Sequence, residues 1–536
     1  MKKYMTLLLC LLLVGVMALA QAEDLVTIRL MGIDRSESYG TQSMTLSDQI
    51  KNNAPGWQKL TEEMAKRGVK LELDLIPADQ YDVVCQTRLA TGLDCDIFNI
   101  TPLDMQTRMQ LVTRKMLQPV NQLIDNYCND ETKLFFSEGL GSTMIKRFTV
   151  EDGNMYWLPE MQYVHSNGKV ANSNKSMLVR RDWLDALGME MPETLDEFTN
   201  MLIAFQENDM NGSGEKDEIL SIKISSFGNG IAQWFGMGPE LAYIKGENIE
   251  SPWYNENMKD YVTYMRYLIE NNLVDTSGQS DAKMAENKVS ATYSWTSQTW
   301  LEPSVVVQDG APYAYYVGMQ AKATDEPPYL MSSSGHSFQG YDYAITSNCK
   351  NPEAAAAVID YLYTMDYAML TEMGLEGYTY YIGEDGIAYN LPDSELETDD
   401  QKLVKLHGNL WCKNAVLPAY INRSMDMEIE NCIAVGKQYG HENGWTEKGE
   451  VFVSFFDYEY TVPYSTEPLL AVATIEESAR MRELSTDLKT YSDELLTKLV
   501  LGQKSLDDWD SYIADLQRLG LDEYIAIMQA RYDRAK

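Results

Sequence analysis

One segment of the sequence combines residue types and a spacing that suit a metal ion. Oxygen-bearing side chains recur between residues 209 and 218, with glycine at 212 and 214, and they are Asp209, Asn211, Ser213, Glu215, Asp217 and Glu218. Hard cations such as Ca²⁺ take about six to eight oxygen ligands, which a tightly wound acidic loop can supply. The pattern therefore predicts a calcium site.

The loop departs from a standard EF-hand at its end. Leu220 stands where the EF-hand carries a bidentate glutamate, and Glu218 could supply that carboxylate instead. The alternative interpretation is a solvated acidic turn after a helix. Because no nucleophile or base is adjacent, we expect a structural ion that fixes the helix end against a strand over residues 219–224.

The sequence offers little that indicates catalysis. His441-Glu442 lacks the second histidine of the H-E-x-x-H zinc motif, and the chain has no G-x-S-x-G elbow and no Walker-type phosphate loop. With 80 acidic residues, some carboxylate pair always fits glycoside hydrolysis, so such a pair is uninformative. We therefore predict a binding protein and not an enzyme.

The charge and aromatic content narrow the classes of partner. The chain has 536 residues and a formal net charge of −36, which disfavours nucleic acid and anionic membranes as partners. The chain has 34 Tyr and 10 Trp residues, which together far outnumber its 12 Phe residues. Such rings suit contact with water or a polar ligand, although ordinary amphipathic packing also explains them.

The N-terminus indicates export. Lys2 and Lys3 precede an apolar run, Leu7–Leu19, and small residues follow up to Ala22, which predicts a secretory signal peptide over residues 1–22. Leu9 precedes Cys10, so the chain lacks a clear lipobox and we expect a secreted or cell-surface protein. Six later cysteines are too sparse for a disulfide framework, and we expect mostly buried thiols with at most one or two bridges.

Strands and helices are predicted to alternate along the chain. The first five predicted elements are strand 26–31, helix 57–66, strand 69–76, helix 80–90 and strand 95–100. This order favours an open α/β sheet whose ligands bind beyond the carboxyl ends of the strands. Further helices are predicted from a Thr194–Glu197 capping box, from Asn351-Pro352, and over residues 505–519.

The segment before the acidic loop resembles a known family. Leu178-Val-Arg-Arg-Asp-Trp-Leu-Asp-Ala-Leu-Gly188 is followed by Pro192-Glu-Thr-Leu-Asp-Glu-Phe198 and then by the loop. Together with Glu286-Asn-Lys-Val-Ser-Ala-Thr-Tyr-Ser-Trp295 and the C-terminal strings, this resembles the extracellular solute-binding proteins of bacterial carbohydrate importers, particularly LipO-like and alginate-binding members.

The resemblance implies an architecture. It is an α/β fold of the two-lobed, periplasmic-binding-protein-like type II class, in which crossing strands form a hinge and ligand is held in a cleft between the lobes. We expect residues 23–178 plus 340–420 to form the N-terminal lobe and residues 179–339 plus 421–536 to form the C-terminal lobe. Hinge closure would deliver the ligand to the permease subunits of an ABC importer.

The resemblance also implies the ligands of the calcium site. Asp209, Asn211, Ser213, Asp217 and Glu218 would bind through their side chains, and Glu215 through its backbone carbonyl. Relatives often carry Asn or Asp at the place of Ser213, whose hydroxyl is a weaker ligand.

A sugar presents hydroxyls and a flat apolar face, so its cleft needs aromatic platforms beside a few polar groups. The predicted aromatic contacts are Trp295, Trp157, Trp411 and Tyr378, and the predicted polar contacts are Arg35, Gln162 and Glu376. Core packing is the alternative for Trp295 and Trp157. Three other tryptophans belong to either the cleft or the core, namely Trp234, Trp253 and Trp300.

We therefore predict a monomeric solute-binding protein that captures an oligosaccharide. The acidity favours a neutral sugar over an alginate-like polyanion unless basic groups such as Arg35 reverse the local field. Two alternatives remain, a secreted glycan-degrading enzyme and a glycan-binding surface protein without a role in transport.

Overall fold

The computed structural model describes fifteen stretches of the chain. They are residues 25–34, 37–39, 42–166, 169–170, 175–278, 281–295, 307–308, 311–312, 316–324, 330–332, 336–383, 388–391, 420–424, 461–463 and 470–536. The predicted signal peptide lies outside them.

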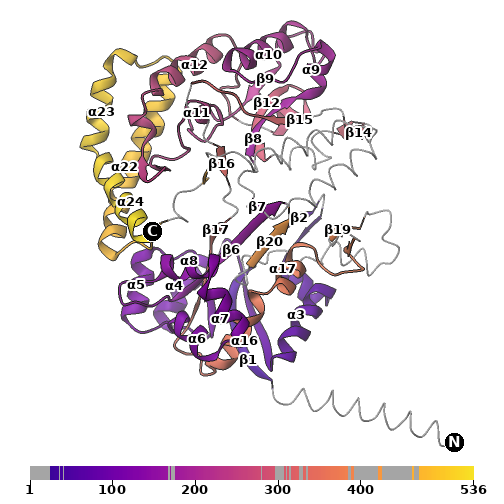
Figure 1. Ribbon diagram of the computed structural model, residues 1–536, viewed down its shortest axis with the longest axis vertical. Helices are drawn as coiled ribbons and strands as arrows, with labels where there is room; N and C mark the ends of the chain where they lie inside the picture. Colours follow the sequence, from indigo (N-terminus) through magenta and orange to yellow (C-terminus); the bar gives the residue numbers. More distant parts are fainter. Residues whose placement is uncertain are drawn as a thin grey trace, which may run out of the picture. The chain divides into compact units, whose positions relative to one another are not determined.

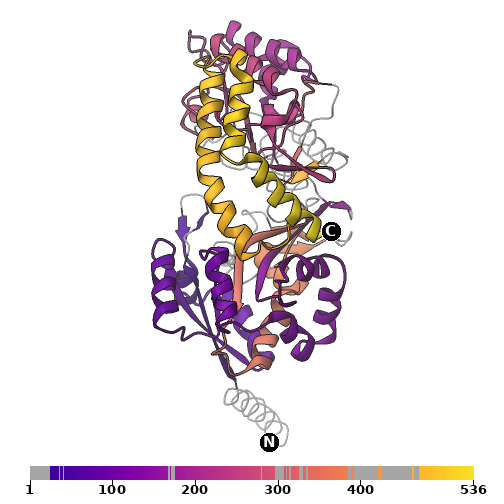
Figure 2. The same cartoon turned by 90° about the vertical axis from the view of Figure 1, so that its left-hand side faces the viewer.

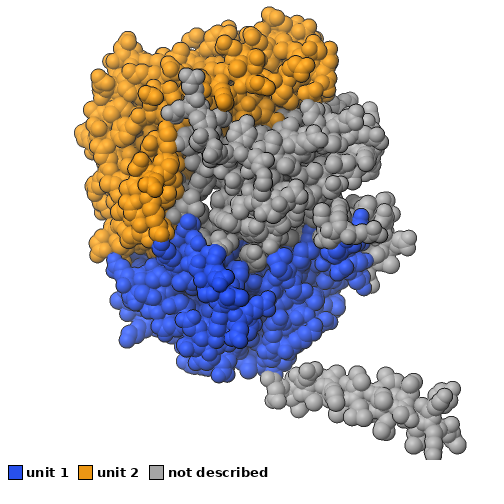
Figure 3. All heavy atoms as spheres, in the orientation of Figure 1, with its two compact units in different colours: residues 1–162, 338–383, 390–422 blue, residues 163–337, 384–389, 423–536 orange. Residues whose placement is uncertain are grey.

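The chain forms two compact units, coloured separately in Figure 3. Unit 1 comprises Met1–Gln162, Phe338–Gly383 and Asn390–Asn422, and unit 2 comprises Tyr163–Ser337, Glu384–Tyr389 and Arg423–Lys536. Four strands contain a boundary between the units, namely β6 (Trp157–Ser166), β17 (His336–Ile345), β19 (Ala388–Asn390) and β20 (Tyr420–Ser424). Three of them are neighbours in one sheet, in the order β20-β6-β17.

Unit 1 combines strands of this sheet with helices packed against it (Figure 1). In chain order its other elements are β1 (Val26–Asp34), β2 (Glu37–Tyr39), β3 (Gln42–Met44), α2 (Leu46–Lys51), α3 (Pro55–Lys66), β4 (Val69–Pro77), α4 (Tyr81–Thr91), β5 (Ile97–Asn99), α5 (Met105–Thr113), α6 (Val120–Tyr127), α7 (Asp130–Ser137), α8 (Gly139–Phe148), α16 (Pro352–Leu362), α17 (Met365–Glu372) and β18 (Tyr380–Ile382). β18 pairs with β19 (Ala388–Asn390).

The sheet has the order β20-β6-β17-β5-β1-β4, and β7 (Lys169–Val170) pairs with β6. β1 is parallel to both β4 and β5, whereas β17 is antiparallel to β5. The predicted β-α-β-α-β order is thus confirmed. Ile28, Leu30 and Met31 of β1 are fully buried. Because neighbouring strand residues face opposite ways, burial of both Leu30 and Met31 shows that helices or loops cover both faces of the sheet here.

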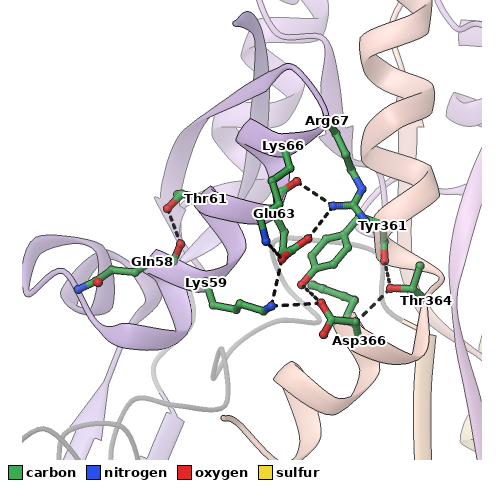
Figure 4. A network of polar contacts seen from close by, with 10 residues as sticks. Gln58, Lys59, Thr61, Glu63, Lys66, Arg67, Tyr361, Thr364 and Asp366 are labelled. Atoms are coloured by element: carbon green, nitrogen blue, oxygen red, sulfur yellow. Dashed lines mark hydrogen bonds and ion pairs between the residues drawn. The ribbon is translucent and has the colours of Figure 1, made fainter. Parts of the chain in front are cut away.

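A carboxylate on α3 gathers three basic side chains (Figure 4). The Glu63 carboxylate lies 2.6 Å from Lys66 Nζ, 2.9 Å from Arg67 Nη1 and 3.0 Å from Lys59 Nζ. The hydrogen bond from Lys66 contributes most to lowering the pKa of Glu63, to about 2, against the opposing effect of burial. The carboxylate is therefore held ionised.

The same cluster joins α3 to α16 and α17. The Arg67 guanidinium lies 4.5 Å from the centre of the Tyr361 ring, a cation–π arrangement. The Tyr361 hydroxyl donates to Asp366 Oδ2 at 2.9 Å, and Lys59 Nζ lies 3.8 Å from the same carboxylate. Segments about 300 residues apart in sequence are thus fixed together by charge and by ring packing.

Unit 2 is built on the sheet β15-β8-β12-β9. In chain order its elements after β7 are β8 (Lys175–Arg180), α9 (Arg181–Leu187), α10 (Leu195–Glu207), β9 (Ile219–Ser221), α11 (Ile231–Trp234), β10 (Tyr243–Lys245), β11 (Asn248–Glu250), η1 (Pro252–Tyr254), α12 (Met258–Glu270), α13 (Asp281–Ala285), β12 (Val289–Trp295), β13 (Val307–Gln308), β14 (Ala311–Pro312), β15 (Tyr316–Met319), β16 (Leu330–Ser332), β21 (Thr461–Pro463), α22 (Ile475–Val500), η5 (Leu506–Asp508), α23 (Trp509–Arg518) and α24 (Leu521–Ala535).

One hydrophobic core connects this sheet with the helices of unit 2. α10 contributes Phe198, Leu202 and Phe205, all fully buried, and the long C-terminal helix α22 contributes Leu488 and Leu499. Figure 2 shows α22 alongside α23, and the two helices are in contact. The predicted α/β fold class is confirmed.

Four cysteines of unit 1 are free and buried, namely Cys85, Cys95, Cys128 and Cys349. Burial raises the pKa of the Cys85 and Cys95 thiols to about 11 and about 12, which keeps them protonated and unreactive. Within the described residues, no helix is both long and apolar enough to span a membrane.

Candidate functional site

The predicted calcium loop connects α10 with β9 in unit 2. α10 begins with the predicted capping box, in which Thr194 and Glu197 satisfy each other's backbone N–H groups. After the helix the chain turns through three residues of positive φ, Asp209 at 48°, Gly212 at 71° and Gly214 at 77°. Glycine tolerates this conformation without steric cost, so the spacing of the two glycines lets the loop wind tightly.

Two carboxylates of the loop each use only one oxygen. The backbone N–H of Gly214 donates to Asp209 Oδ2 at 3.0 Å, and that of Asn211 donates to Glu218 Oε1 at 3.1 Å. The other oxygens, Asp209 Oδ1 and Glu218 Oε2, are buried and accept no hydrogen bond. A buried acceptor without a partner costs about 1–3 kcal/mol, more for a charged group, and a bound cation would offset that cost.

A third carboxylate, Asp217, is held ionised by its neighbours. Burial acts to raise its pKa, but hydrogen bonds from Asn211 Nδ2 at 2.7 Å and Ser213 Oγ at 2.9 Å, together with the Lys288 charge, lower it below the ordinary value. The Lys288 ammonium lies 3.6 Å from Asp217 Oδ2. The anionic form that a metal ligand needs is therefore the stable one.

The donor set of the loop fits a hard cation. Across the described part of the chain, no three His, Cys, Asp or Glu side chains converge closely enough to form a metal cluster by themselves. The loop also offers amide and hydroxyl oxygens, from Asn211 and Ser213, and the Glu215 carbonyl, which accepts from Ser213 Oγ at 3.4 Å. Such a mixture of oxygens is typical of calcium loops.

Trp157, a predicted sugar contact, lies at the start of β6 with no exposed surface. The Arg108 guanidinium carbon is 5.4 Å from the centre of its ring, and the indole N–H finds no hydrogen-bond partner. Arg108 in turn pairs with Asp342 of β17, and both side chains are only 9% exposed. Trp157 is thus packed in unit 1, and its contact with sugar stays a prediction.

Glu376 and Tyr378 lie on an exposed turn after α17. Tyr378 is 45% exposed, and Glu376 is bridged to Tyr380 through the backbone. The turn is fixed from inside by the buried Thr379, whose hydroxyl donates to the Met373 carbonyl at 2.6 Å. Both predicted ligand contacts are therefore accessible to solvent.

The remaining predicted contacts lie in strands or outside the described residues. Gln162 is in β6 and is the last residue of the first segment of unit 1, and Trp295 ends β12, where its backbone pairs with Lys175. Arg35 and Trp411 lie outside the described residues. Trp234 and Trp253, for which cleft and core were both open, belong to the core of unit 2, and Trp300 is outside the described residues.

Sequence reasoning missed the polar network at the carboxyl end of β5. Arg108 Nε donates to the Leu103 carbonyl at 2.9 Å, and the Asp342 backbone N–H donates to Thr101 Oγ1 at 2.8 Å. Arg108 and Asp342 are 234 residues apart in sequence and carry no local motif. Only the prediction that ligands bind beyond the carboxyl ends of the strands pointed to this end of the sheet.

Comparison with known proteins identifies the family. Residues 48–369 match the bacterial extracellular solute-binding proteins. The chain belongs to this family. A two-unit α/β protein whose sheet strands pass between the units is the architecture expected of such a solute-binding protein, so the predicted family and fold are both confirmed.

Two curated relatives are similar in sequence to this solute-binding protein. FusA of Streptococcus pneumoniae serotype 4 (strain TIGR4), a fructooligosaccharide ABC transporter substrate-binding protein, is 24% identical over 445 residues, which cover 80% of this chain and 77% of FusA. Lipoprotein LipO of Bacillus subtilis strain 168 is 34% identical over 106 residues, 18% of this chain and 21% of LipO.

Solved structures share the fold. An HMO-binding, ABC-transporter-associated solute-binding protein from Bifidobacterium longum infantis has a TM-score of 0.70 at 18% identity. The match covers 96% of this chain and 99% of that protein's chain. S. pneumoniae FusA in complex with kestose has a TM-score of 0.65 at 20% identity, and the match covers 95% of this chain and 99% of the FusA chain. A FusA EF-hand mutant with fructo-nystose has a TM-score of 0.65 at 19% identity and the same coverage.

Proposed function

We propose that this solute-binding protein captures an oligosaccharide outside the cell and delivers it to the permease of an ABC importer. The observation that carries the proposal is the similarity to FusA over 80% of this chain, within the family matched over residues 48–369. FusA is a fructooligosaccharide-binding protein of an ABC transporter, so a related ligand class is the natural inference.

We infer that the ligand is held between the two lobes by aromatic platforms and polar side chains. The proposed contacts are Trp295, Trp157, Trp411, Tyr378, Arg35, Gln162 and Glu376. The strands β6, β17 and β20 connect units 1 and 2, which supports hinge closure around a ligand. Tyr378 and Glu376 are already exposed to solvent, as a ligand contact requires.

The net charge supports a neutral ligand. A chain with 80 acidic and 44 basic residues generates a negative potential that repels polyanionic sugars. A neutral fructooligosaccharide or similar sugar meets no such repulsion. We therefore propose neutral oligosaccharides over alginate-like ones.

We also propose that the loop over residues 209–218 binds a structural Ca²⁺. Its ligands would be the side chains of Asp209, Asn211, Ser213, Asp217 and Glu218 and the backbone carbonyl of Glu215. The two buried carboxylate oxygens without partners support a cation here, as does the EF-hand of FusA. The ion would fix the end of α10 against β9 and neutralise the loop.

Calorimetric titration tests the ligand class. The purified chain without residues 1–22 would be titrated with kestose, other neutral oligosaccharides, an alginate trisaccharide and a peptide. We expect one neutral oligosaccharide to bind with a micromolar or tighter Kd and a stoichiometry of one. Tight binding of the peptide or of the alginate trisaccharide in its place would refute the neutral-sugar assignment.

The glycan-degrading enzyme is the alternative from another class, and product analysis separates it from a receptor. After incubation with the tightest-binding oligosaccharide, the sugar should be recovered intact. Release of shorter products, abolished by changing one carboxylate pair, would support the enzyme.

A further inference from the structure

Unit 2 carries a second candidate site, distinct in its elements from the calcium loop and from the predicted sugar contacts. A pocket of about 470 Å³ lies where η1 and the start of α12 meet α23. Ligand pockets of small molecules span about 300–1,000 Å³, so this one can take one or two sugar rings.

Apolar groups form one part of the pocket wall. The rings of Trp253 and Trp509 lie 6.0 Å apart, tilted by 39°, and Ile513 follows one turn further along α23. Trp253 is fixed because it is only 1% exposed and donates its indole N–H to Ser492 Oγ at 2.8 Å. Trp509 is half-buried, so part of its ring remains open to solvent.

Tyr254 and Asn255 line part of the rest, together with three ionic side chains, namely Glu256, Lys259 and Asp510. All three are exposed, and none forms a hydrogen bond or ion pair with another described residue. The Lys259 Nζ lies 5.5 Å from the centre of the Trp509 ring. The ionic side chains thus offer two acceptors and one donor beside an aromatic surface.

The charges of these groups select among ligand classes. An anionic ligand would face Glu256 and Asp510 in a chain of net charge −36. A cationic ligand would compete with Lys259, which already occupies the cation–π position on Trp509. A neutral polyhydroxy ligand can donate to both carboxylates, accept from the ammonium and lay its apolar face on the ring.

We propose that this pocket is a second, weaker carbohydrate site that binds a neutral sugar unit. A site of this kind on unit 2 alone would hold part of a longer glycan, or a second sugar molecule, at the protein. The inference does not depend on which sugar the proposed main site selects.

Fluorine NMR of the full chain labelled with 5-fluorotryptophan tests the proposal. The Trp509 resonance is assigned by its loss in Trp509→Phe, and kestose, sucrose, trigalacturonate and tetramethylammonium are the probes. We expect kestose and sucrose to shift the Trp509 resonance at millimolar concentration, without a shift from the other two. Two results would overturn the proposal. One is no shift of the Trp509 resonance with either sugar at about 50 mM, a concentration far above a useful Kd. The other is a shift with tetramethylammonium alone.

A double variant, Glu256→Gln with Asp510→Asn, separates this pocket from the main site. Both positions are exposed, so the fold should persist. We expect the variant to weaken the Trp509 response at least about fivefold and to leave the calorimetric Kd of the main site unchanged within about twofold. A Trp509 response that survives the double variant, or that depends on protein concentration as dimerisation would, would contradict a sugar pocket, whatever the main site binds.

Discussion

The Glu63 cluster makes a quantitative prediction about stability and pH. Replacing Glu63 by Gln removes the carboxylate that pairs with Lys59, Lys66 and Arg67. The pKa of Glu63 falls from 4.5 to about 2 in the folded protein. At about 1.4 kcal/mol for each pH unit, the difference corresponds to about 3 kcal/mol of stability at neutral pH. Lys66 is 65% exposed, so solvent screening reduces the expected loss to about 2 kcal/mol.

The sign of the pH dependence follows from the lowered pKa. A carboxyl group whose pKa is lower in the folded state stabilises the protein fully above its unfolded value, and this stabilisation is lost as the pH falls through the folded value. The cost of Glu63→Gln should therefore be about 2 kcal/mol at pH 7 and less than about half of that at pH 3. Near pH 2 the two proteins should be about equally stable.

The assay is urea unfolding combined with hydrogen exchange of the α3 peptide, residues 55–66, which reports on unit 1 separately. Glu62→Gln is the matched control, because it removes the same charge from the adjacent, exposed position of the same helix. We expect the control to change the free energy of unfolding by less than about 0.5 kcal/mol. A Glu63→Gln cost that equals the control, or one that does not vary between pH 7 and pH 3, would refute the reasoning.

Three further predictions concern other parts of the chain. Chelation should lower the Tm of unit 2 by several degrees and Ca²⁺ should restore it, whereas the Glu218→Gln variant should lose this response; calorimetry that shows indifference to chelator would remove the calcium site. Asp342→Asn should destabilise unit 1 by about 3 kcal/mol, because it leaves the buried Arg108 without its counter-charge, and an unchanged urea midpoint would contradict this. Gly230→Ala should destabilise unit 2 by at least about 2 kcal/mol, because the φ of Gly230 is +87° and a Cβ there would clash with the Tyr293 ring. A Tm within about 1 °C of that of the parent protein would contradict this prediction.

Local signals in the sequence predicted much of the fold. The strand 69–76 is observed as Val69–Pro77, and the Thr194 capping box starts α10 as expected. Both depend on periodicity or on contacts between residues three or four apart, which the sequence shows directly. The predicted strand 219–224 is shorter, Ile219–Ser221, because only that part pairs with β12 and the rest turns away.

Features that depend on distant segments were not predictable in the same way. Helix α22, the longest among the described residues, was not predicted from the sequence, although Thr474 and Glu477 form a capping box at its start. The pair of Arg108 and Asp342 exists because β17 inserts beside β5, a register that sequence spacing does not reveal. The pocket of the proposed second sugar site likewise brings together Trp253 and Trp509, which lie on segments about 250 residues apart.

The candidate calcium loop was predictable because all of its proposed ligands lie within ten consecutive residues. The structure adds what spacing alone cannot show, namely that one oxygen each of Asp209 and Glu218 is buried without a partner. The proposed sugar contacts come from both units, so sequence spacing could not predict whether they converge.

Hydrogen–deuterium exchange with saturating sugar tests the central claim most directly. With the oligosaccharide that calorimetry selects, we predict slower exchange in peptides from both units, including those that contain Arg35 or Tyr378 of unit 1 and Trp295 of unit 2. Protection of both units is the signature of a ligand held between them by closure about the strands β6, β17 and β20. Protection confined to one unit, or none at saturation, would contradict capture between the lobes.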